Sequence, residues 1–226
     1  MSRKENKNCL VIALPSGRLL KSCIQLLERA GIDLKGGKEI NRKLSFYSCE
    51  KDFKFIITKP IDNPTYIECG VADIGIVGED ILLEEKKDVY KLLDLKLGQY
   101  NMILAAPENN SQGDFFKNNG HRLKIATKFP HIAGEYFRKK GIYVEIIKLY
   151  GSVELAPQVG LADMIVDIVS TGRTLKENKL VIVDEITPLS VQLIVNPISY
   201  KTKHDKIIQL LNNIQKSIIG NKGETK

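Results

Sequence analysis

Short apolar segments that alternate with helical patterns constrain the fold of this chain more than any other feature. Residues 10–14, 123–127 and 163–169 are largely apolar, and each segment runs into a turn that contains glycine or proline. Helical patterns follow such turns, as over residues 20–30, where apolar side chains recur three or four positions apart. This alternation is typical of α/β proteins with parallel strands. We therefore expect an α/β fold.

A second series of strands and helices begins at residue 100, which indicates two lobes. A chain of 226 residues with 43% apolar content is large enough for two cores. We assign residues 1–98 plus 187–226 to lobe I and residues 99–186 to lobe II, and we expect crossing strands to join them. A single amphipathic helix is predicted over residues 200–219. Its apolar face comprises Ile207, Leu210, Leu211, Ile214 and Ile218.

One segment of lobe II combines a strand, a tight turn and the start of a helix. Backbone N–H groups and the positive end of the helix dipole converge at such a junction, so it can hold a phosphate. Ser170, Thr171 and Thr174 add hydroxyl donors, and Gly172 allows the backbone to approach a ligand closely. Asp167 can accept hydrogen bonds from sugar hydroxyls. The segment predicts a site for a phosphorylated ribose, although an ordinary turn with a serine or threonine N-cap also fits it.

Composition narrows the function classes. The net charge is +7, but lysines are scattered among acids without interleaved aromatics, so we expect no nucleic-acid surface. The four cysteines lack a C-x-x-C pair, and Cys9 and Cys23 lie in apolar patterns typical of buried thiols. The apolar run that ends at Leu14 is too short for a signal peptide or a membrane span. We expect a cytoplasmic protein with no membrane association.

Several segments, taken in order, resemble the ATP phosphoribosyltransferase family, the first enzymes of histidine biosynthesis. They include Gly-Ser-Val-Glu at 151–154 and Asp-Ile-Val-Ser-Thr-Gly-Arg-Thr at 167–174. The full set is residues 13–19, 42–44, 64–68, 70–78, 88–94, 147–157 and 160–175. The resemblance spans residues 10–196. The chain resembles the short form of the family, in which a C-terminal histidine-sensing domain is lacking, because one terminal helix is expected to leave no residues for that domain.

The resemblance implies a two-lobed, periplasmic-binding-protein-like (type II) fold with the active site in a cleft between the lobes. It also implies a reaction in which N1 of ATP attacks C1 of 5-phosphoribosyl 1-pyrophosphate and releases pyrophosphate. Mg²⁺ is expected to bind chiefly through substrate phosphates, with its protein ligands unknown, and no covalent nucleophile is expected. Short forms work with a regulatory subunit that resembles histidyl-tRNA synthetase. A homodimer within a hetero-oligomer is expected.

The phosphoribosyl pyrophosphate site is predicted to comprise Asp167, Ser170, Thr171, Gly172, Arg173 and Thr174. The ATP site is predicted to comprise Arg18, Arg42, Lys59, Asp73 and Glu154. Arg18 lies in a helix's first turn, where the dipole disfavours a cation unless it serves an anion. The chain departs from frequent family residues at Ser16, Cys69 and Glu79; the first departure bears on a phosphate contact of the family, and the other two are expected to be peripheral. His121, His131 and His204 lie outside the matching segments and are predicted to be surface residues.

Two other functions fit parts of the pattern. A solute-binding protein would share the fold, but such proteins are usually exported and no signal peptide is recognisable. A type I phosphoribosyltransferase acting on a free base would share the turn. That class normally has two adjacent acids before the turn, whereas Asp167 is followed by Ile168.

Overall fold

The computed structural model describes residues 9–34, 44–48, 50, 52–110 and 122–220. The chain divides into two compact units, Met1–Gly98 with Ser190–Lys226 as unit 1 and Gln99–Leu189 as unit 2. Unit 2 ends at Leu189 rather than at 186, because the strand that begins at Leu180 stays paired with its neighbour up to Leu189. Arg42 and His121 lie outside the described residues.

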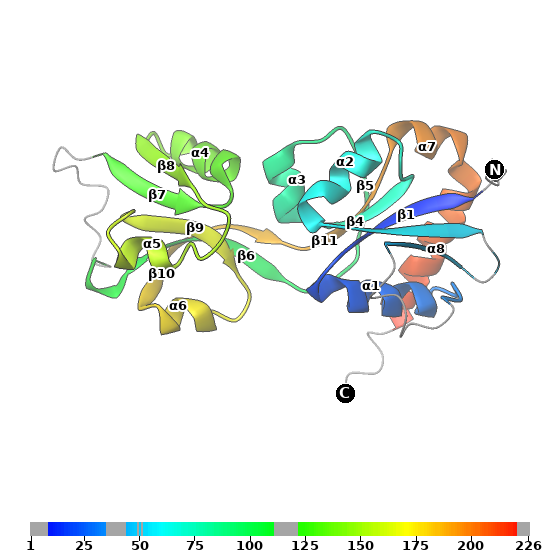
Figure 1. Cartoon of the computed structure of the whole chain (residues 1–226), viewed down its shortest axis with the longest axis horizontal. Coiled ribbons are helices and arrows are strands. Elements are labelled where there is room, and N and C mark those ends of the chain that lie inside the picture. The colour runs from blue at the N-terminus through cyan, green and yellow to red at the C-terminus, as the bar shows by residue number, and fades with distance from the viewer. Residues whose placement is uncertain (1–8, 35–43, 49, 51, 111–121, 221–226) are drawn as a thin grey trace. The chain divides into compact units, whose positions relative to one another are not determined.

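Unit 1 is built on a mixed six-stranded sheet (Figure 1). Its strands are β1 (Leu10–Pro15), β2 (Ser45–Tyr47), β3 (Phe53–Thr58), β4 (Ile74–Gly78), β5 (Tyr90–Asp94) and β11 (Val191–Val195). They are ordered β2-β3-β1-β4-β11-β5. The three central strands β3, β1 and β4 are parallel, and β2, β11 and β5 pair with their neighbours antiparallel. The three parallel strands therefore end at the same edge of the sheet.

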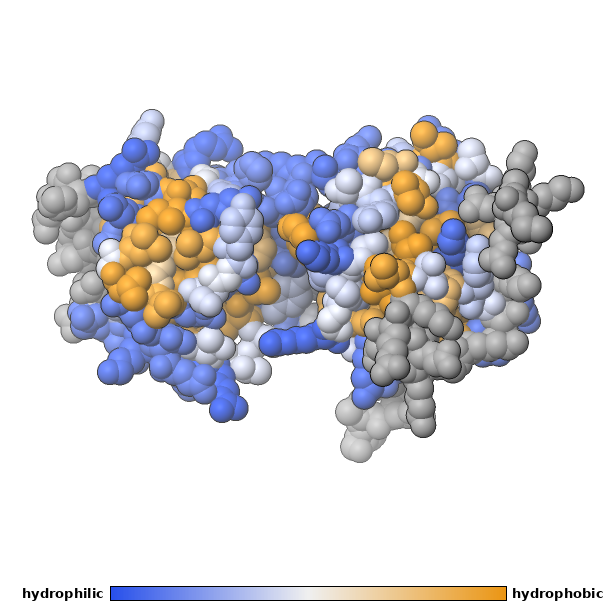
Figure 2. All heavy atoms as spheres, in the orientation of Figure 1, coloured by the Kyte–Doolittle hydropathy of each residue, from blue (hydrophilic) through white to orange (hydrophobic). Residues whose placement is uncertain are grey.

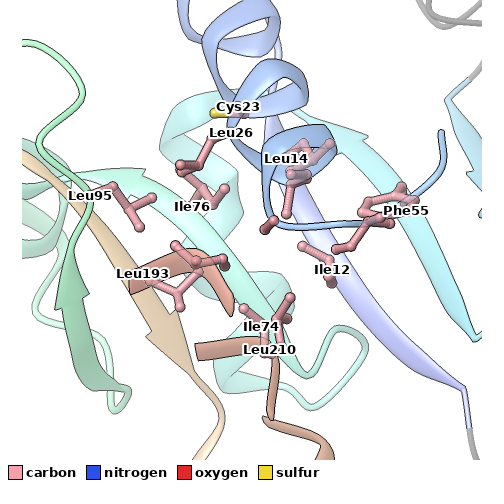
Figure 3. Packing of buried hydrophobic residues seen from close by; sticks show 14 of the residues in the cluster. Ile12, Leu14, Cys23, Leu26, Phe55, Ile74, Ile76, Leu95, Leu193 and Leu210 are labelled. Carbon is pink, nitrogen blue, oxygen red and sulfur yellow. The ribbon is translucent and has the colours of Figure 1, made fainter. Parts of the chain in front are cut away.

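Helices cover both faces of this sheet. One face carries α1 (Arg18–Arg29) and α8 (His204–Gly220), and the other carries α2 (Asn63–Glu68) and α3 (Glu79–Glu85). Because side chains alternate along a strand, Ile12 and Leu14 of β1 pack towards α1 and α8, and Ala13 packs towards α2. Figure 3 shows the first cluster, with Leu26 of α1 and Leu210 of α8 among strand residues.

Local residue chemistry explains where the helices begin and end. Gly17, rather than the preceding Ser16, occupies the N-cap position of α1, at a φ of 84° and without a side-chain hydrogen bond. The same helix ends at Arg29, and Gly31 lies two residues later with a φ of 86° and an N–H that bonds to the Glu28 carbonyl. Cys23 lies on the buried face of α1, and burial raises the pKa of its thiol to about 12.

The C-terminal segment forms two helices rather than the single predicted one. These are α7 (Pro197–Thr202) and α8, with Lys203 between them. Asn196 caps α7 through its Oδ1 atom, which accepts hydrogen bonds from the N–H groups of Ile198 and Ser199, both at 2.9 Å. The predicted apolar face of α8 is confirmed: Ile207, Leu210 and Ile214 are buried, and Leu211 and Ile218 pack beside them.

Unit 2 is built on a mixed five-stranded sheet (Figure 1). Its strands are β6 (Tyr100–Pro107), β7 (Leu123–Thr127), β8 (Val144–Lys148), β9 (Met164–Val169) and β10 (Leu180–Leu189). They are ordered β10-β6-β9-β7-β8. Strands β8, β7 and β9 are parallel, and β6 runs antiparallel to both β9 and β10.

Each face of the second sheet has its own apolar cluster. One face packs against α4 (Pro130–Lys139) through Ile132, Ala133 and Phe137. The opposite face packs against α5 (Leu155–Gln158) and α6 (Arg173–Glu177) through Ala156 and Leu175. No helix in the described part of either unit is long and apolar enough to cross a membrane.

Candidate active site

The three parallel strands of unit 2 end at one edge of their sheet, which we call the carboxyl edge of unit 2. Three segments follow these strand ends: residues 128–130 after β7, 149–154 after β8 and 170–174 after β9. Ligands in open α/β sheets bind at the carboxyl ends of the strands. The structure therefore brings the predicted phosphoribosyl turn and Glu154 to an edge where a ligand site is expected.

The turn after β9 leaves its hydroxyl groups available. Gly172 is the N-cap residue of α6 and adopts a left-handed conformation with a φ of 70°. No side chain caps this helix. The alternative explanation of the segment, an ordinary turn with a serine or threonine N-cap, therefore does not apply at α6. Ser170, Thr171 and Thr174 are exposed, and their hydroxyls make no hydrogen bond to another residue that the structure describes.

Acidic side chains lie at the same edge. Asp167 is half-buried near the end of β9, and its Oδ1 atom accepts a hydrogen bond of 2.8 Å from the N–H of Ile168. Glu154 is also half-buried and occupies the residue before α5. The loop that leads to Glu154 contains Ser152 at a φ of 49°, a conformation that side-chain-bearing residues adopt at an energetic cost.

Arg173 does not project freely from the turn. Its Nε atom lies 2.8 Å from Oε1 of Glu177, one helical turn further along α6. Both side chains are largely exposed, so this ion pair contributes little to stability and can exchange for another anion.

The carboxyl edge of unit 1 carries the described cations of the predicted ATP site. Strands β1 and β3 end opposite each other, with Pro15 in register with Thr58. Arg18 begins α1 just after β1, and Lys59 directly follows β3. Both side chains are exposed, and the first turn of α1 contains no acid that would neutralise Arg18.

Asp73 is not brought together with these cations. It precedes β4, at the opposite end of the sheet from Arg18 and Lys59. The Asp73 side chain is 4% exposed and accepts hydrogen bonds from Val11 N–H at 2.8 Å, Ser199 Oγ at 2.6 Å and Lys203 Nζ at 2.7 Å. The carboxylate thus anchors the C-terminal helices to β1 and β4, which corrects its predicted grouping with Arg18 and Lys59.

The three departures from the family pattern lie in unit 1. Ser16 is half-buried directly after β1, and Cys69 is exposed at the end of α2. Glu79 begins α3 and forms an ion pair of 2.9 Å with Lys91. Ser16 and Glu79 directly follow parallel strands β1 and β4, so both lie at the edge that carries Arg18 and Lys59, whereas Cys69 precedes β4.

Sequence reasoning missed two residues at the carboxyl edge of unit 2. Thr127 ends β7 with no exposed surface, and the exposed Lys128 follows it. The sequence did contain a signal for Lys128: a cation directly after a buried strand lies at the edge where ligands bind.

A separate hollow of about 730 Å³ lies elsewhere in unit 2. Its lining includes Pro107, Gln158, Glu177 and Asn178, at the end of α6 that is remote from Gly172. Gln158 and Asn178 bond to each other across 2.8 Å, so polar groups of this hollow satisfy one another.

The chain is similar to known proteins over most of its length. Residues 59–216 match the family model described as ATP phosphoribosyltransferase. The ATP phosphoribosyltransferase of Caldanaerobacter subterraneus subsp. tengcongensis is 50% identical over 209 residues, which cover 92% of this chain and 97% of that protein. The enzyme of Halalkalibacterium halodurans is 44% identical over 211 residues, covering 93% of this chain and 97% of that protein.

Comparison with solved structures indicates the same family. A chain of the ATP phosphoribosyl transferase (HisG:HisZ) complex from Thermotoga maritima superposes with a TM-score of 0.80 at 39% identity, covering 93% of this chain and 99% of that one. The BvgS VFT2 domain of Bordetella pertussis, at 13% identity and a TM-score of 0.58, covers 95% of this chain and 88% of that one and shows only a shared fold. The predicted periplasmic-binding-protein-like class is confirmed. The family model and the relatives, which this chain covers almost from end to end, show that it belongs to the ATP phosphoribosyltransferase family.

Proposed function

We propose that the turn over residues 170–174 binds the 5-phosphate of phosphoribosyl pyrophosphate in the family reaction, the condensation of ATP with this sugar to phosphoribosyl-ATP and pyrophosphate. One observation carries the assignment: the exposed hydroxyls of the turn are unused by the fold at a carboxyl edge of parallel strands. Gly172 keeps the backbone of the turn open, because no heavy atom lies within 4 Å of the point that a Cβ would occupy there.

Asp167 is proposed to face the ribose. Glu154, which the sequence analysis grouped with the ATP site, is assigned to the ribose instead, because it follows β8 at the same edge of unit 2 as the turn. Departure of pyrophosphate builds positive charge on the sugar ring and negative charge on the leaving group. Half-buried carboxylates beside the ring would stabilise the first charge and accept hydrogen bonds from the ribose hydroxyls. Arg173 would contribute to the phosphate site after exchanging its partner Glu177 for the substrate anion.

ATP phosphates are proposed to bind Arg18 and Lys59 at the carboxyl edge of unit 1, together with Arg42. The support is that Arg18 and Lys59 are exposed cations that follow neighbouring parallel strands. Arg18→Ala is expected to raise the KM for ATP more than the KM for phosphoribosyl pyrophosphate. Asp73 is left out of this proposal because its carboxylate is engaged inside unit 1.

The family uses a divalent metal, and we propose Mg²⁺. The donor chemistry fits an ion held chiefly by substrate phosphates, because no group of three potential metal-binding side chains occurs in the described ranges. Asp167 and Glu154 are the carboxylates that would complete its shell. When bound, the ion would neutralise charge on the diphosphate.

A second polypeptide is proposed as partner, since the Thermotoga maritima structure is described as a HisG:HisZ complex. We propose that this partner is a regulatory subunit resembling histidyl-tRNA synthetase and that the catalytic chain is a homodimer within the assembly. Figure 2 shows apolar residues gathered over α5, and the exposed apolar side chains of Leu155, Val159 and Leu161 are candidates for contact with another chain of the assembly.

The cytoplasmic location remains a prediction.

The activity is tested by mixing the purified chain with ATP, phosphoribosyl pyrophosphate and Mg²⁺, with and without the partner, and detecting phosphoribosyl-ATP. We expect product whenever the partner is present. Ribose 5-phosphate titrated by calorimetry tests the phosphate turn separately. Product formation by a protein that does not bind ribose 5-phosphate would contradict the placement of the turn.

A further inference from the structure

The end of β7 is fastened to β9 by a buried hydroxyl. Thr127 has no exposed surface, and its Oγ1 atom donates a hydrogen bond of 2.7 Å to the carbonyl oxygen of Val166. The same Oγ1 atom accepts a hydrogen bond of 2.9 Å from the N–H of Phe129. One side chain therefore fixes the backbone on both sides of Lys128 relative to the residue that precedes Asp167.

Lys128 is placed beside the proposed ribose site by strand register. Thr127 is in register with Val166, so the next residues, Lys128 and Asp167, are neighbours across the two strands. Neighbouring strands lie about 4.8 Å apart. Lys128 is thus within side-chain reach of a ligand held at Asp167.

The face of the sheet is also defined. Ala126 packs in the cluster beneath α5 and α6, whereas Ile125 and Phe129 pack in the cluster beneath α4. Alternation along the strand then puts Lys128 on the side of α5 and α6, the side that carries the phosphoribosyl turn. Lys148 ends β8 at the same edge. Val144 and Ile146 of this strand pack towards α4, and alternation puts Lys148 on that same side, away from α5 and α6.

Charge distinguishes Lys128 from the other cation of this site. Arg173 is paired with Glu177 at 2.8 Å. Lys128 is exposed and has no ion pair or hydrogen bond to its side chain within the ranges that the structure describes. The turn and its acids otherwise offer no unpaired positive charge to a substrate that carries three phosphate groups.

We propose that Lys128 binds the diphosphate of phosphoribosyl pyrophosphate and that Thr127 is its positioning residue. This inference rests on the proposed function, because it takes the turn as the 5-phosphate site. In the reaction the C1–O bond breaks and its electron pair leaves with the diphosphate, while the N1 lone pair of ATP forms the new bond to C1. An ammonium group on the diphosphate stabilises the charge that grows on the leaving oxygen.

The first test replaces Lys128 by glutamine in the complete assembly. Lys128→Gln is expected to raise the KM for phosphoribosyl pyrophosphate about tenfold or more and to lower kcat, since a hydrogen bond to a charged group is lost. The KM for ATP should change less than about twofold. Lys148→Gln is the matched control, because it removes the same charge from the same edge on the other face and should leave both KM values unchanged.

Ribose 5-phosphate separates this contact from the phosphate turn, because it carries the 5-phosphate without the diphosphate. By calorimetry, Lys128→Gln should bind ribose 5-phosphate as the wild type does and bind phosphoribosyl pyrophosphate more weakly. Equal weakening of both ligands would overturn the diphosphate assignment, as would unchanged phosphoribosyl pyrophosphate binding. A wild-type chain that binds phosphoribosyl pyrophosphate but not ribose 5-phosphate would overturn the proposed turn site, and this contact with it.

The second test addresses Thr127 through its hydroxyl. Thr127→Val keeps the shape of the side chain and removes the hydrogen bonds at 2.7 and 2.9 Å, so it should raise the KM for phosphoribosyl pyrophosphate without raising that for ATP. Thr127→Ser retains the hydroxyl and should restore the wild-type KM. A purely structural role would lower the Tm of Thr127→Val but leave the two KM values in their wild-type ratio, and that result would overturn the positioning role.

Discussion

Gly172 combines a backbone requirement with an open environment. Its φ of 70° lies in the left-handed region, which glycine occupies without steric cost. No heavy atom lies within 4 Å of where a Cβ would sit at this position, so a substituent would project into the space where we place the substrate phosphate.

Gly172→Val is therefore expected to weaken phosphoribosyl pyrophosphate binding strongly, as measured by calorimetry. The left-handed conformation costs a side-chain-bearing residue roughly 1–2 kcal/mol, so some stability will be lost in any case. Gly141→Val controls for this strain, because Gly141 has a φ of 69° and open surroundings at the far end of α4. Similar losses of stability in both variants, with affinity lost only in Gly172→Val, are expected; unchanged affinity would count against the turn.

Asn63 illustrates a residue whose polarity the fold does not use. It is fully buried as the first residue of α2, and neither Nδ2 nor Oδ1 has a hydrogen-bond partner among the described residues. Its side chain lies against Gly75 of β4, where an added Cβ would meet Asn63 Oδ1 at 2.5 Å. Helix α2 therefore approaches the backbone of β4 closely at this glycine.

We predict that Asn63→Leu stabilises the chain. The substitution keeps the approximate shape and removes an unpaired buried amide, whose desolvation costs about 1–3 kcal/mol. Urea unfolding should show a higher midpoint with an unchanged slope. Asn212→Leu on the exposed side of α8 provides the control, with little change expected. A less stable Asn63→Leu would indicate that the amide has a partner such as an internal water.

At the scale of elements, α4 is fastened to β10 by a cluster of three side chains. Asp184 Oδ2 accepts hydrogen bonds from Tyr136 Oη at 2.5 Å and from Lys140 Nζ at 2.6 Å. The ammonium of Lys140, followed by the phenol of Tyr136, holds the pKa of Asp184 below its usual value. The cluster thus links the helix that follows β7 to the edge strand of the sheet.

The stability that Asp184 contributes should depend on pH. Its folded pKa lies below the unfolded value of about 3.9, so the contribution is complete above that pH and is lost as the pH falls through the folded pKa. We expect Asp184→Asn to be less stable than the wild type at neutral pH by under about 1 kcal/mol, since both charged partners are well exposed. Urea unfolding at several pH values should show this difference shrinking below about pH 4. A constant difference, or one matched by Glu145→Gln on the exposed side of β8, would contradict it.

Elements with strong local signals could be predicted from the sequence. Residues 123–127 form β7 as expected, and α4 begins directly after it at Pro130, where a proline-marked turn and apolar spacing agree. The helix α3 was missed although Gly78 followed by Glu79 and Asp80 is a recognisable helix start. At the break between α7 and α8, Lys203 contacts Asp73 at 2.7 Å across 130 positions of sequence, and such a contact has no local signal.

Some residues of the candidate site could likewise be predicted from the sequence, and others could not. The turn and its glycine were predictable, because they form one contiguous segment at a strand end. Lys128 and the anchoring role of Asp73 were not, because each depends on which strands are neighbours and which edge they share. Strand order is a property of the folded chain and has only a weak local signal.

At the scale of the whole molecule, two connections join the units, one after β5 and one between β10 and β11. Asp94 accepts hydrogen bonds from the backbone and side chain of Lys96 at 2.9 and 2.6 Å, and Gln192 donates to Ser190 Oγ at 2.7 Å. Burial opposes ionisation of Asp94, yet the hydrogen bonds from Lys96 and Ser190 outweigh it and lower its pKa. Both connections are therefore fastened where they enter unit 1.

Regulation by histidine is expected to belong to the assembly rather than to either unit. If histidine binds the proposed partner, inhibition reaches the catalytic chain only as a coupling free energy between two polypeptides, typically about 1–3 kcal/mol. We expect the isolated chain to be nearly inactive and insensitive to histidine, and the reconstituted complex to be active and inhibited. Initial rates of phosphoribosyl-ATP formation, measured with and without partner and histidine, test this. Histidine-sensitive turnover by the purified chain alone would contradict the prediction, because the sensing site would then lie within this polypeptide.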